Sequence, residues 1–131
     1  MLTPMSLKTV PRPTDAELAI LRILWRRGPR TVRQILSDFG SETGYTTILK
    51  FLQIMTAKGL AVRDERERTH VYAAAFPEET TQRQLLDDLL ERAFGGSSNK
   101  LVMQALAGTN PSEAELRELR GLLDSLGRKT E

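Results

Sequence analysis

Apolar positions recur at helical spacing in six stretches of the chain, which glycine, proline and short polar segments separate. Three of these stretches open with a capping box, in which a Ser or Thr precedes a Glu or Gln by three residues. The boxes are Thr14–Glu17, Thr31–Gln34 and Ser112–Glu115. Helices are therefore expected over residues 14–27, 31–39, 45–58, 77–94, 98–106 and 112–126.

A different pattern occupies the segment between the third and fourth expected helices. Residues 60–63 and 69–73 are rich in Val, Thr and Tyr and flank the charged run 64–68, which predicts a β-hairpin. Three helices followed by a hairpin make a winged helix. The predicted fold is thus mainly α with a small β-hairpin wing: a winged helix-turn-helix domain followed by a C-terminal helical dimerisation region. The expected limits are a flexible arm at 1–13, the winged-helix domain at 14–76 and the dimerisation domain at 77–131.

The third expected helix, 45–58, separates apolar from polar side chains. Its apolar side carries Ile48, Phe51, Leu52 and Met55, and its polar side carries Thr46, Lys50, Gln53 and Ala57. The polar side holds hydroxyls, an amide and a cation without an acid, which suits the phosphates and base edges of a DNA major groove. An ordinary amphipathic surface helix is the alternative, although such a helix usually mixes charges of both signs.

The elements around this helix favour the DNA interpretation. The short helix 31–39 and the turn 41–44 precede it in the order of a helix-turn-helix, although two antiparallel core helices would give the same pattern. The wing, 60–75, follows it and supplies arginines to meet phosphate or the minor groove. The predicted DNA-binding residues are Thr46, Thr47, Lys50, Gln53, Arg63, Arg66 and Arg68. The alternating charges at the wing tip fit a self-paired, solubilising turn equally well.

The charge is distributed unevenly along the chain. Residues 1–76 hold 12 basic and 7 acidic side chains, whereas residues 77–131 hold 7 basic and 10 acidic ones, so the net charges are +5 and −3. A basic first half points weakly to a polyanionic partner, and the asymmetry indicates that the halves have different tasks.

The acidic second half carries leucine stripes on three short helices. Such helices cannot readily bury these stripes within one chain, so we expect a second copy to cover them. The predicted dimerisation residues are Leu85, Leu86, Leu89, Leu90, Phe94, Leu116, Leu119 and Leu123. Folding of the same helices back onto the winged domain is the alternative. A strict coiled coil is disfavoured because Gly95-Gly96 and Pro111 interrupt any heptad.

Four segments in order resemble the penicillinase-repressor family (BlaI/MecI), which also includes the copper-responsive CopY repressors. They are Pro13–Leu18 with Ile23-Leu24-Trp25, Tyr45-Thr46-Thr47-Ile48, Lys58-Gly59-Leu60, and Val71-Tyr72. The resemblance covers about residues 14–126 and implies a homodimeric winged-helix repressor of inverted-repeat operators. By position, Thr46, Thr47 and Lys50 match the family's recognition helix.

Two departures from the family pattern affect what the resemblance implies. The wing tip commonly carries Glu-Gly-Arg, but here Arg66 or Glu67 stands at the glycine, which puts the wing geometry in question. The paired Cys motifs of the copper-responsive branch are missing, which argues against copper sensing. In antibiotic-responsive members, a membrane sensor-protease triggers cleavage between the two halves. The corresponding candidate region is near 92–97, at Ala93, Phe94 and Gly95.

Catalysis and metal binding find no support in the sequence. There is one His, no Cys, and no Gly-rich phosphate loop after a strand, so we predict no enzyme activity, metal or cofactor. His70 is expected to pack or to be exposed rather than to bind metal. Asp87, Asp88 and Glu91 are expected to form an exposed acidic face rather than a divalent-cation site.

Partners and compartment complete the expectations. No run approaches the roughly 18 apolar residues of a membrane span, and residues 1–10 lack the apolar block of a secretory signal, so we expect a cytoplasmic protein without membrane insertion. The expected partners are double-stranded DNA with a palindromic operator, a second copy of the chain, and the sensor-protease pathway that the resemblance implies. The alternative function is a winged-helix adaptor that binds another protein and does not read DNA sequence.

Overall fold

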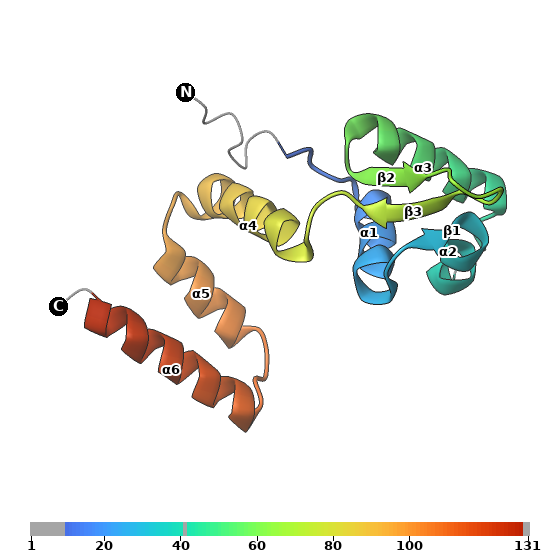
Figure 1. Ribbon diagram of the computed structural model, residues 1–131. Helices are drawn as coiled ribbons and strands as arrows, with labels where there is room; N and C mark the ends of the chain where they lie inside the picture. Colours follow the sequence, from blue (N-terminus) through green and yellow to red (C-terminus); the bar gives the residue numbers. More distant parts are fainter. Residues whose placement is uncertain (1–9, 41, 130–131) are drawn as a thin grey trace. The chain divides into compact units, whose positions relative to one another are not determined.

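The computed structural model describes residues 10–40 and 42–129 (Figure 1). Its elements are α1 (Asp15–Arg27), β1 (Arg30–Thr31), α2 (Val32–Phe39), α3 (Tyr45–Lys58), β2 (Ala61–Asp64), β3 (Val71–Ala74), α4 (Glu78–Phe94), α5 (Ser98–Ala107) and α6 (Glu113–Lys129). The predicted mainly helical winged helix-turn-helix with further helices after it is confirmed. The expectation of a flexible arm falls, for residues 1–9, outside the described residues.

The three capping boxes form at the expected helix starts. In each box the third helical residue's side chain accepts a hydrogen bond from the N-cap amide, at 2.9 Å for Thr14, 3.0 Å for Thr31 and 2.8 Å for Ser112. Gly40 and Gly59 follow α2 and α3 with φ of 71° and 85°, the left-handed conformation that ends a helix most cheaply at glycine. Local sequence chemistry therefore sets the limits of these helices.

The sheet has one more strand than the sequence predicted. The hairpin of β2 and β3 pairs Ala61 with Ala74 and Asp64 with Val71, as expected for a wing. β1 joins its other edge, giving the order β1-β3-β2 with all neighbours antiparallel. The sequence interpretation missed β1 because it is two residues long and its Thr31 also caps α2.

The chain divides into two compact units, residues 1–88 and 89–131. In the first unit, α1, α2 and α3 surround a core to which the sheet also contributes (Figure 1). Ile20, Ile35, Ile48, Leu52 and Met55 have no exposed area. Trp25 packs against this core, and its indole N–H donates to the carbonyl of Phe76 at 2.9 Å.

The segment before α1 is packed where it is described. Val10 is 8% exposed, Pro13 is buried, and the side-chain amide of Gln84 donates to the Val10 carbonyl. Arg12 pairs with Asp88 at 2.9 Å. Two of the described residues of the predicted flexible arm, Val10 and Arg12, are therefore held by Gln84 and Asp88 of α4, which belong to the same unit.

The second unit lacks a comparable core. No side chain of α5 is buried, and α6 has none among the residues whose exposure is described. Apolar side chains in this unit and at the end of the first therefore face outward. The large exposed ones of α4, α5 and α6 are Leu86, Leu89, Val102, Met103, Leu122, Leu123 and Leu126.

Candidate nucleic-acid interface

α3 is anchored on one side and exposed on the other. Ile48, Leu52 and Met55 lie in the core with 0% exposure, and Phe51 packs against them. The opposite face is exposed and contains no acid; its residues are Tyr45, Thr46, Thr47, Lys50, Gln53, Ile54 and Ala57. The predicted division of this helix is therefore confirmed.

The four predicted recognition residues of α3 all lie on the surface. Thr46, Lys50 and Gln53 follow one another at four and three positions and so form one stripe along the helix, with Thr47 beside it. Lys50 has no ion-pair partner in the described part of the chain. Its charge is therefore available to an external anion. That these residues bind DNA stays a prediction.

A groove of about 500 Å³ runs beside this face, between the start of α2, α3 and the wing. It brings together three of the predicted residues: Gln53 from α3, and Arg63 and Arg68 from the wing. Arg66 lines a separate hollow at the wing tip, with Asp64 and Glu67. The groove beside α3 has both polar and apolar lining residues, including three arginines, and is partly open to solvent, so it fits a charged chain better than an enclosed small molecule.

Two residues that line the groove were missed by the sequence interpretation. The guanidinium carbon of Arg33 lies 5.4 Å from the centre of the Tyr45 ring, within range of a cation–π contact. Arg33 is the second residue of a helix capped by Thr31, where backbone amides also point toward an approaching anion. In the sequence, an Arg two residues after the capping Thr31 was the signal that could have identified Arg33 as a candidate.

The wing arginines differ in how they are paired. Arg66 contacts both carboxylate oxygens of Asp64, at 2.7–3.1 Å, and Arg63 donates from Nε to Glu65 at 2.7 Å. The Arg66 hydrogen bonds lower the pKa of Asp64 to about 2. Arg68 has no ion-pair partner among the described residues. The self-paired turn considered from sequence is thus present for Arg63 and Arg66.

The wing tip closes without the family's glycine. No non-glycine residue in the described ranges has a positive φ, so Arg66 and Glu67 adopt ordinary backbone conformations there. The Asp64 carboxylate supports the turn by accepting the backbone N–H of Arg66 at 3.0 Å. A side-chain hydrogen bond therefore stabilises this tip where the family commonly has Gly.

An ion pair with a buried carboxylate fixes the far end of α3. Lys58 donates to Glu17 at 2.7 Å, and the Glu17 side chain is only 4% exposed. Burial opposes ionisation of Glu17, but hydrogen bonds from Lys58 and the Thr14 backbone outweigh it, so the pKa of Glu17 lies below its ordinary value of 4.5. This pair ties the start of α1 to the last turn of α3.

His70 and the acidic residues of α4 do not gather into a metal site in the described part of the chain. His70 is exposed in the segment just before β3, rather than within the strand as predicted, and lines the groove beside α3. Asp87 lies 3.7 Å from Arg83, and Asp88 pairs with Arg12.

The predicted dimerisation residues are partly or largely exposed in the single chain. Leu86, Leu89 and Leu123 are 39%, 48% and 63% exposed, and the other five are intermediate. These apolar stripes are thus available to a partner.

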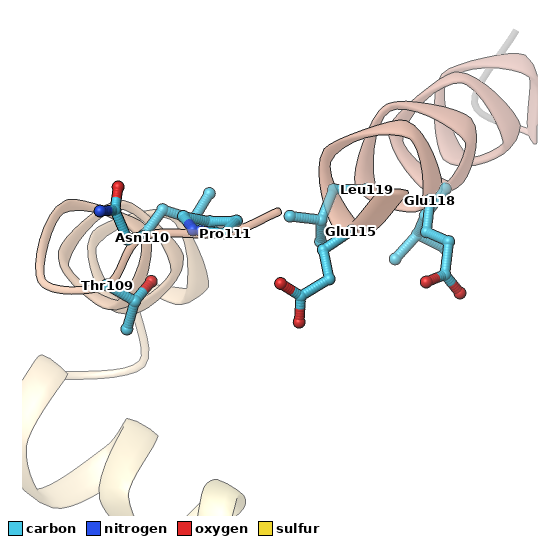
Figure 2. A pocket seen from close by; sticks show the side chains of 8 residues that line it. Thr109, Asn110, Pro111, Glu115, Glu118 and Leu119 are labelled. Carbon is cyan, nitrogen blue, oxygen red and sulfur yellow. The ribbon is translucent and has the colours of Figure 1, made fainter. Parts of the chain in front are cut away.

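A further hollow of about 600 Å³ lies between the loop after α5 and the start of α6. Figure 2 shows Thr109, Asn110 and Pro111 of that loop with Glu115, Glu118 and Leu119 of α6.

The candidate cleavage region lies where α4 ends. Ala93 and Gly95 are exposed, and Phe94 is partly so. Gly95 and Gly96 have positive φ, which produces the break between α4 and α5.

Among the helices of residues 10–40 and 42–129, none combines the length and the apolar character that a membrane span needs.

A three-helix core, a two-stranded wing and an exposed, acid-free third helix define a winged helix-turn-helix protein. The chain belongs to the penicillinase repressor family, whose sequence profile matches residues 13–125. The family prediction made from the sequence is confirmed.

Individual relatives agree with this membership. The penicillinase repressor of Bacillus licheniformis is 22% identical over 120 residues, covering 90% of this chain and 94% of its own. The transcriptional regulator BlaI of Mycobacterium tuberculosis is 29% identical over 92 residues, covering 68% and 67%.

Similar solved structures include two winged-helix domains. The monomeric form of B. licheniformis BlaI, solved with the blaP half-operator, has a TM-score of 0.48 and 22% identity, covering 54% of this chain and 89% of that one. A homodimeric winged helix-turn-helix DNA-binding domain from Mycobacterium bovis has a TM-score of 0.46 and 24% identity, covering 61% and 72%.

Proposed function

We propose that this protein is a homodimeric transcriptional repressor that binds an inverted-repeat operator through α3 and the wing. The observation that carries the proposal is the exposed, acid-free face of α3, whose reverse is fixed in the core. Membership of a repressor family supports the same function. A rigid helix with a single-sign polar face suits a duplex, because both phosphates and groove edges can be met without an unfavourable acid.

The side chains on this face have different roles in the proposal. Lys50, Arg33 and Arg68 meet phosphates, which sets orientation and a strong salt dependence. Thr46, Thr47 and Gln53 reach base edges, and Gln53 has the paired donor and acceptor that match adenine in the major groove. Sequence preference then comes from α3, whereas the flanking cations provide affinity for any duplex.

The leucine stripes supply the pairing in this proposal. Leu86, Leu89 and Leu123 are more than one-third exposed in a single chain, and water contact with such stripes is unfavourable. A twofold interface would cover both copies of each stripe and repeat the reading helix about 34 Å along the DNA. An inverted repeat in the operator follows from that symmetry.

Release of the operator by cleavage between the halves is the regulatory part of the proposal. Exposed Ala93 and Gly95 at the end of α4 support access by a protease, and the positive-φ Gly95 and Gly96 already break the helix there. In the native cell, inducer treatment should yield a fragment ending near residues 92–97. An intact chain that still holds its operator after induction would remove this part.

A salt titration against genomic DNA fragments tests the proposed function. Affinity for selected fragments should fall steeply with salt, at a log–log slope of about −0.9 per neutralised phosphate. Lys50→Ala should reduce that slope by about one on every sequence, because Lys50 meets phosphate in this proposal; loss of discrimination at one base pair would assign Lys50 to guanine instead. Lys100→Ala removes the same charge from exposed α5 and should change neither. Full-strength, fully specific binding by Lys50→Ala would contradict the assignment.

A protein-binding adaptor is the second candidate, because α3 also exposes apolar area. Ile54 is 41% exposed and Tyr45 is 42% exposed, and both lie on the outward face. An adaptor would bind DNA fragments with little sequence dependence. The same titration therefore separates the two functions, since only the repressor should combine a steep slope with a large preference for particular fragments.

A further inference from the structure

The wing tip holds two arginines against acids of the same tip. Arg66 makes a two-oxygen contact with Asp64, and Arg63 contacts Glu65 through two of its nitrogens, the terminal one at 2.5 Å. All four residues lie within positions 63–66, so the pairs form locally, with little chain to order. The tip therefore carries several cations but little free positive charge.

The Arg66 pair is well suited to persist beside DNA. A two-oxygen contact fixes the planar guanidinium in the geometry that it would otherwise use to bind a phosphate. Asp64 also accepts the backbone N–H of Arg66, so the turn itself holds the carboxylate in place. Because the pKa of Asp64 is lowered to about 2, the carboxylate stays charged throughout the pH range of any binding experiment.

Neighbouring charges in the tip lack such partners. Arg68 has no ion-pair partner among the described residues and lines the groove beside α3. Glu67 is exposed and likewise has none there. The tip therefore contains two neutralised arginines, a free arginine and a free acid, within six positions.

We propose that Asp64 and Glu65 limit DNA affinity by holding Arg66 and Arg63 away from phosphate. This inference rests on the proposed function. A DNA phosphate can bind Arg66 only after it displaces the Asp64 carboxylate. The displaced carboxylate then repels the same phosphates, so replacing the internal ion pair by a phosphate contact adds little to DNA affinity. In the wild-type protein Arg68 alone carries the wing's contribution. Because phosphate contacts are independent of sequence, the acids weaken binding to operator and unrelated DNA by the same factor.

Asp64→Asn is the direct test. The amide oxygen of Asn can still accept the Arg66 backbone N–H, so the turn keeps its hydrogen bond while the ion pair is lost. One released arginine should steepen the log–log salt slope by about 0.9 and tighten binding roughly five- to tenfold near 0.1 M salt. The factor should be equal for selected and unrelated fragments.

Glu67→Gln is the matched control, because it removes the same charge from the same tip without releasing an arginine. It should leave the salt slope unchanged. The double variant Asp64→Asn/Arg66→Ala completes the cycle: it should show none of the gain of Asp64→Asn, because no arginine is then left to be released. Arg68→Ala should weaken wild-type binding and reduce its slope by about one.

Other outcomes overturn the inference. It fails if Asp64→Asn and Glu67→Gln give the same slope, or if Asp64→Asn tightens binding as much in an Arg66→Ala background as in the wild type. Glu65→Gln repeats the test on Arg63 should Asp64→Asn unfold, which circular dichroism and the thermal midpoint would reveal. A wild-type protein that binds no DNA overturns the proposed function as well, whereas normal wild-type binding with unresponsive variants overturns the inference alone.

Discussion

The two units differ in what they do with apolar side chains. In the first, α1, α2, α3 and the sheet enclose several residues with no exposed area, and polar side chains of α3 remain outside. In the second, α5 and α6 have comparable leucine content but bury no described side chain. A helix stripe without a facing element is unfavourable in water, so we expect the second unit to be stabilised by another surface.

In the proposed function, this difference gives each unit of one small chain its own task. A unit with its own core can hold a reading helix rigidly, because its packing fixes the direction of each exposed side chain. A unit with exposed apolar stripes gains stability when it associates with a second copy. The number of associated copies then sets how many α3 helices can contact DNA at once. We therefore expect substitutions in the core of the first unit to change its stability, and substitutions in the apolar stripes of the second unit to change self-association.

The largest effect is expected from removing a core side chain of α3. Leu52→Ala should lower the free energy of unfolding by about 2–5 kcal/mol, because Leu52 has no exposed area and its loss leaves a cavity. Leu126→Ala, at a position 49% exposed, should change the winged unit's unfolding much less. Denaturant titrations followed by Trp25 fluorescence measure both, and equal losses would remove the contrast.

The next effect is expected on self-association. Leu123→Asp places a charge on the apolar stripe of α6 and should weaken the dimer roughly a hundredfold, equivalent to about 2.8 kcal/mol. Ser125→Asp adds the same charge at an exposed polar position and should leave association unchanged. Sedimentation equilibrium measures the dimer. Two variants with equal mass distributions would indicate that the stripe is not the interface.

A smaller effect is expected from the ion pair that fixes the end of α3. Glu17→Gln should cost about 1–3 kcal/mol of unfolding free energy at neutral pH, because Lys58 loses a buried, hydrogen-bonded partner. The folded-state pKa of Glu17 lies below 4.5, so this contribution is fully present above that value and is lost as pH falls through the folded-state pKa.

The pH dependence can be checked without a separate reference protein. Wild type and Glu17→Gln are unfolded by denaturant at intervals between pH 7 and pH 2, and the difference between them is plotted. It should be constant at higher pH and should shrink toward zero in acid. A difference that stays constant down to the lowest pH would show that the Glu17 charge is not what stabilises the fold.

Local chemistry made much of the fold predictable. The boxes at Thr14, Thr31 and Ser112, and the glycines after α2 and α3, act within one helical turn, so their effects can be read directly from neighbouring residues. The faces of α3 were equally clear, because its periodicity separates the core residues from Thr46, Lys50 and Gln53.

What the sequence did not reveal depends on contacts between distant positions. β1 exists because Arg30 and Thr31 meet Tyr72 and Val71, and two residues carry no strand signal of their own. The contact of Arg33 with Tyr45 requires the turn between α2 and α3 to be in place. In the wing, the alternating charges were visible, but which arginines are paired depends on the turn geometry.

A footprint on DNA selected from the organism's genome reports sequence preference and pairing of two copies in one experiment. We expect strong protection of a symmetrical sequence, with two half-sites about one helical turn apart, and loss of that paired pattern in Leu123→Asp. Protection that is independent of sequence, or a single isolated half-site bound equally well by wild type and Leu123→Asp, would contradict it.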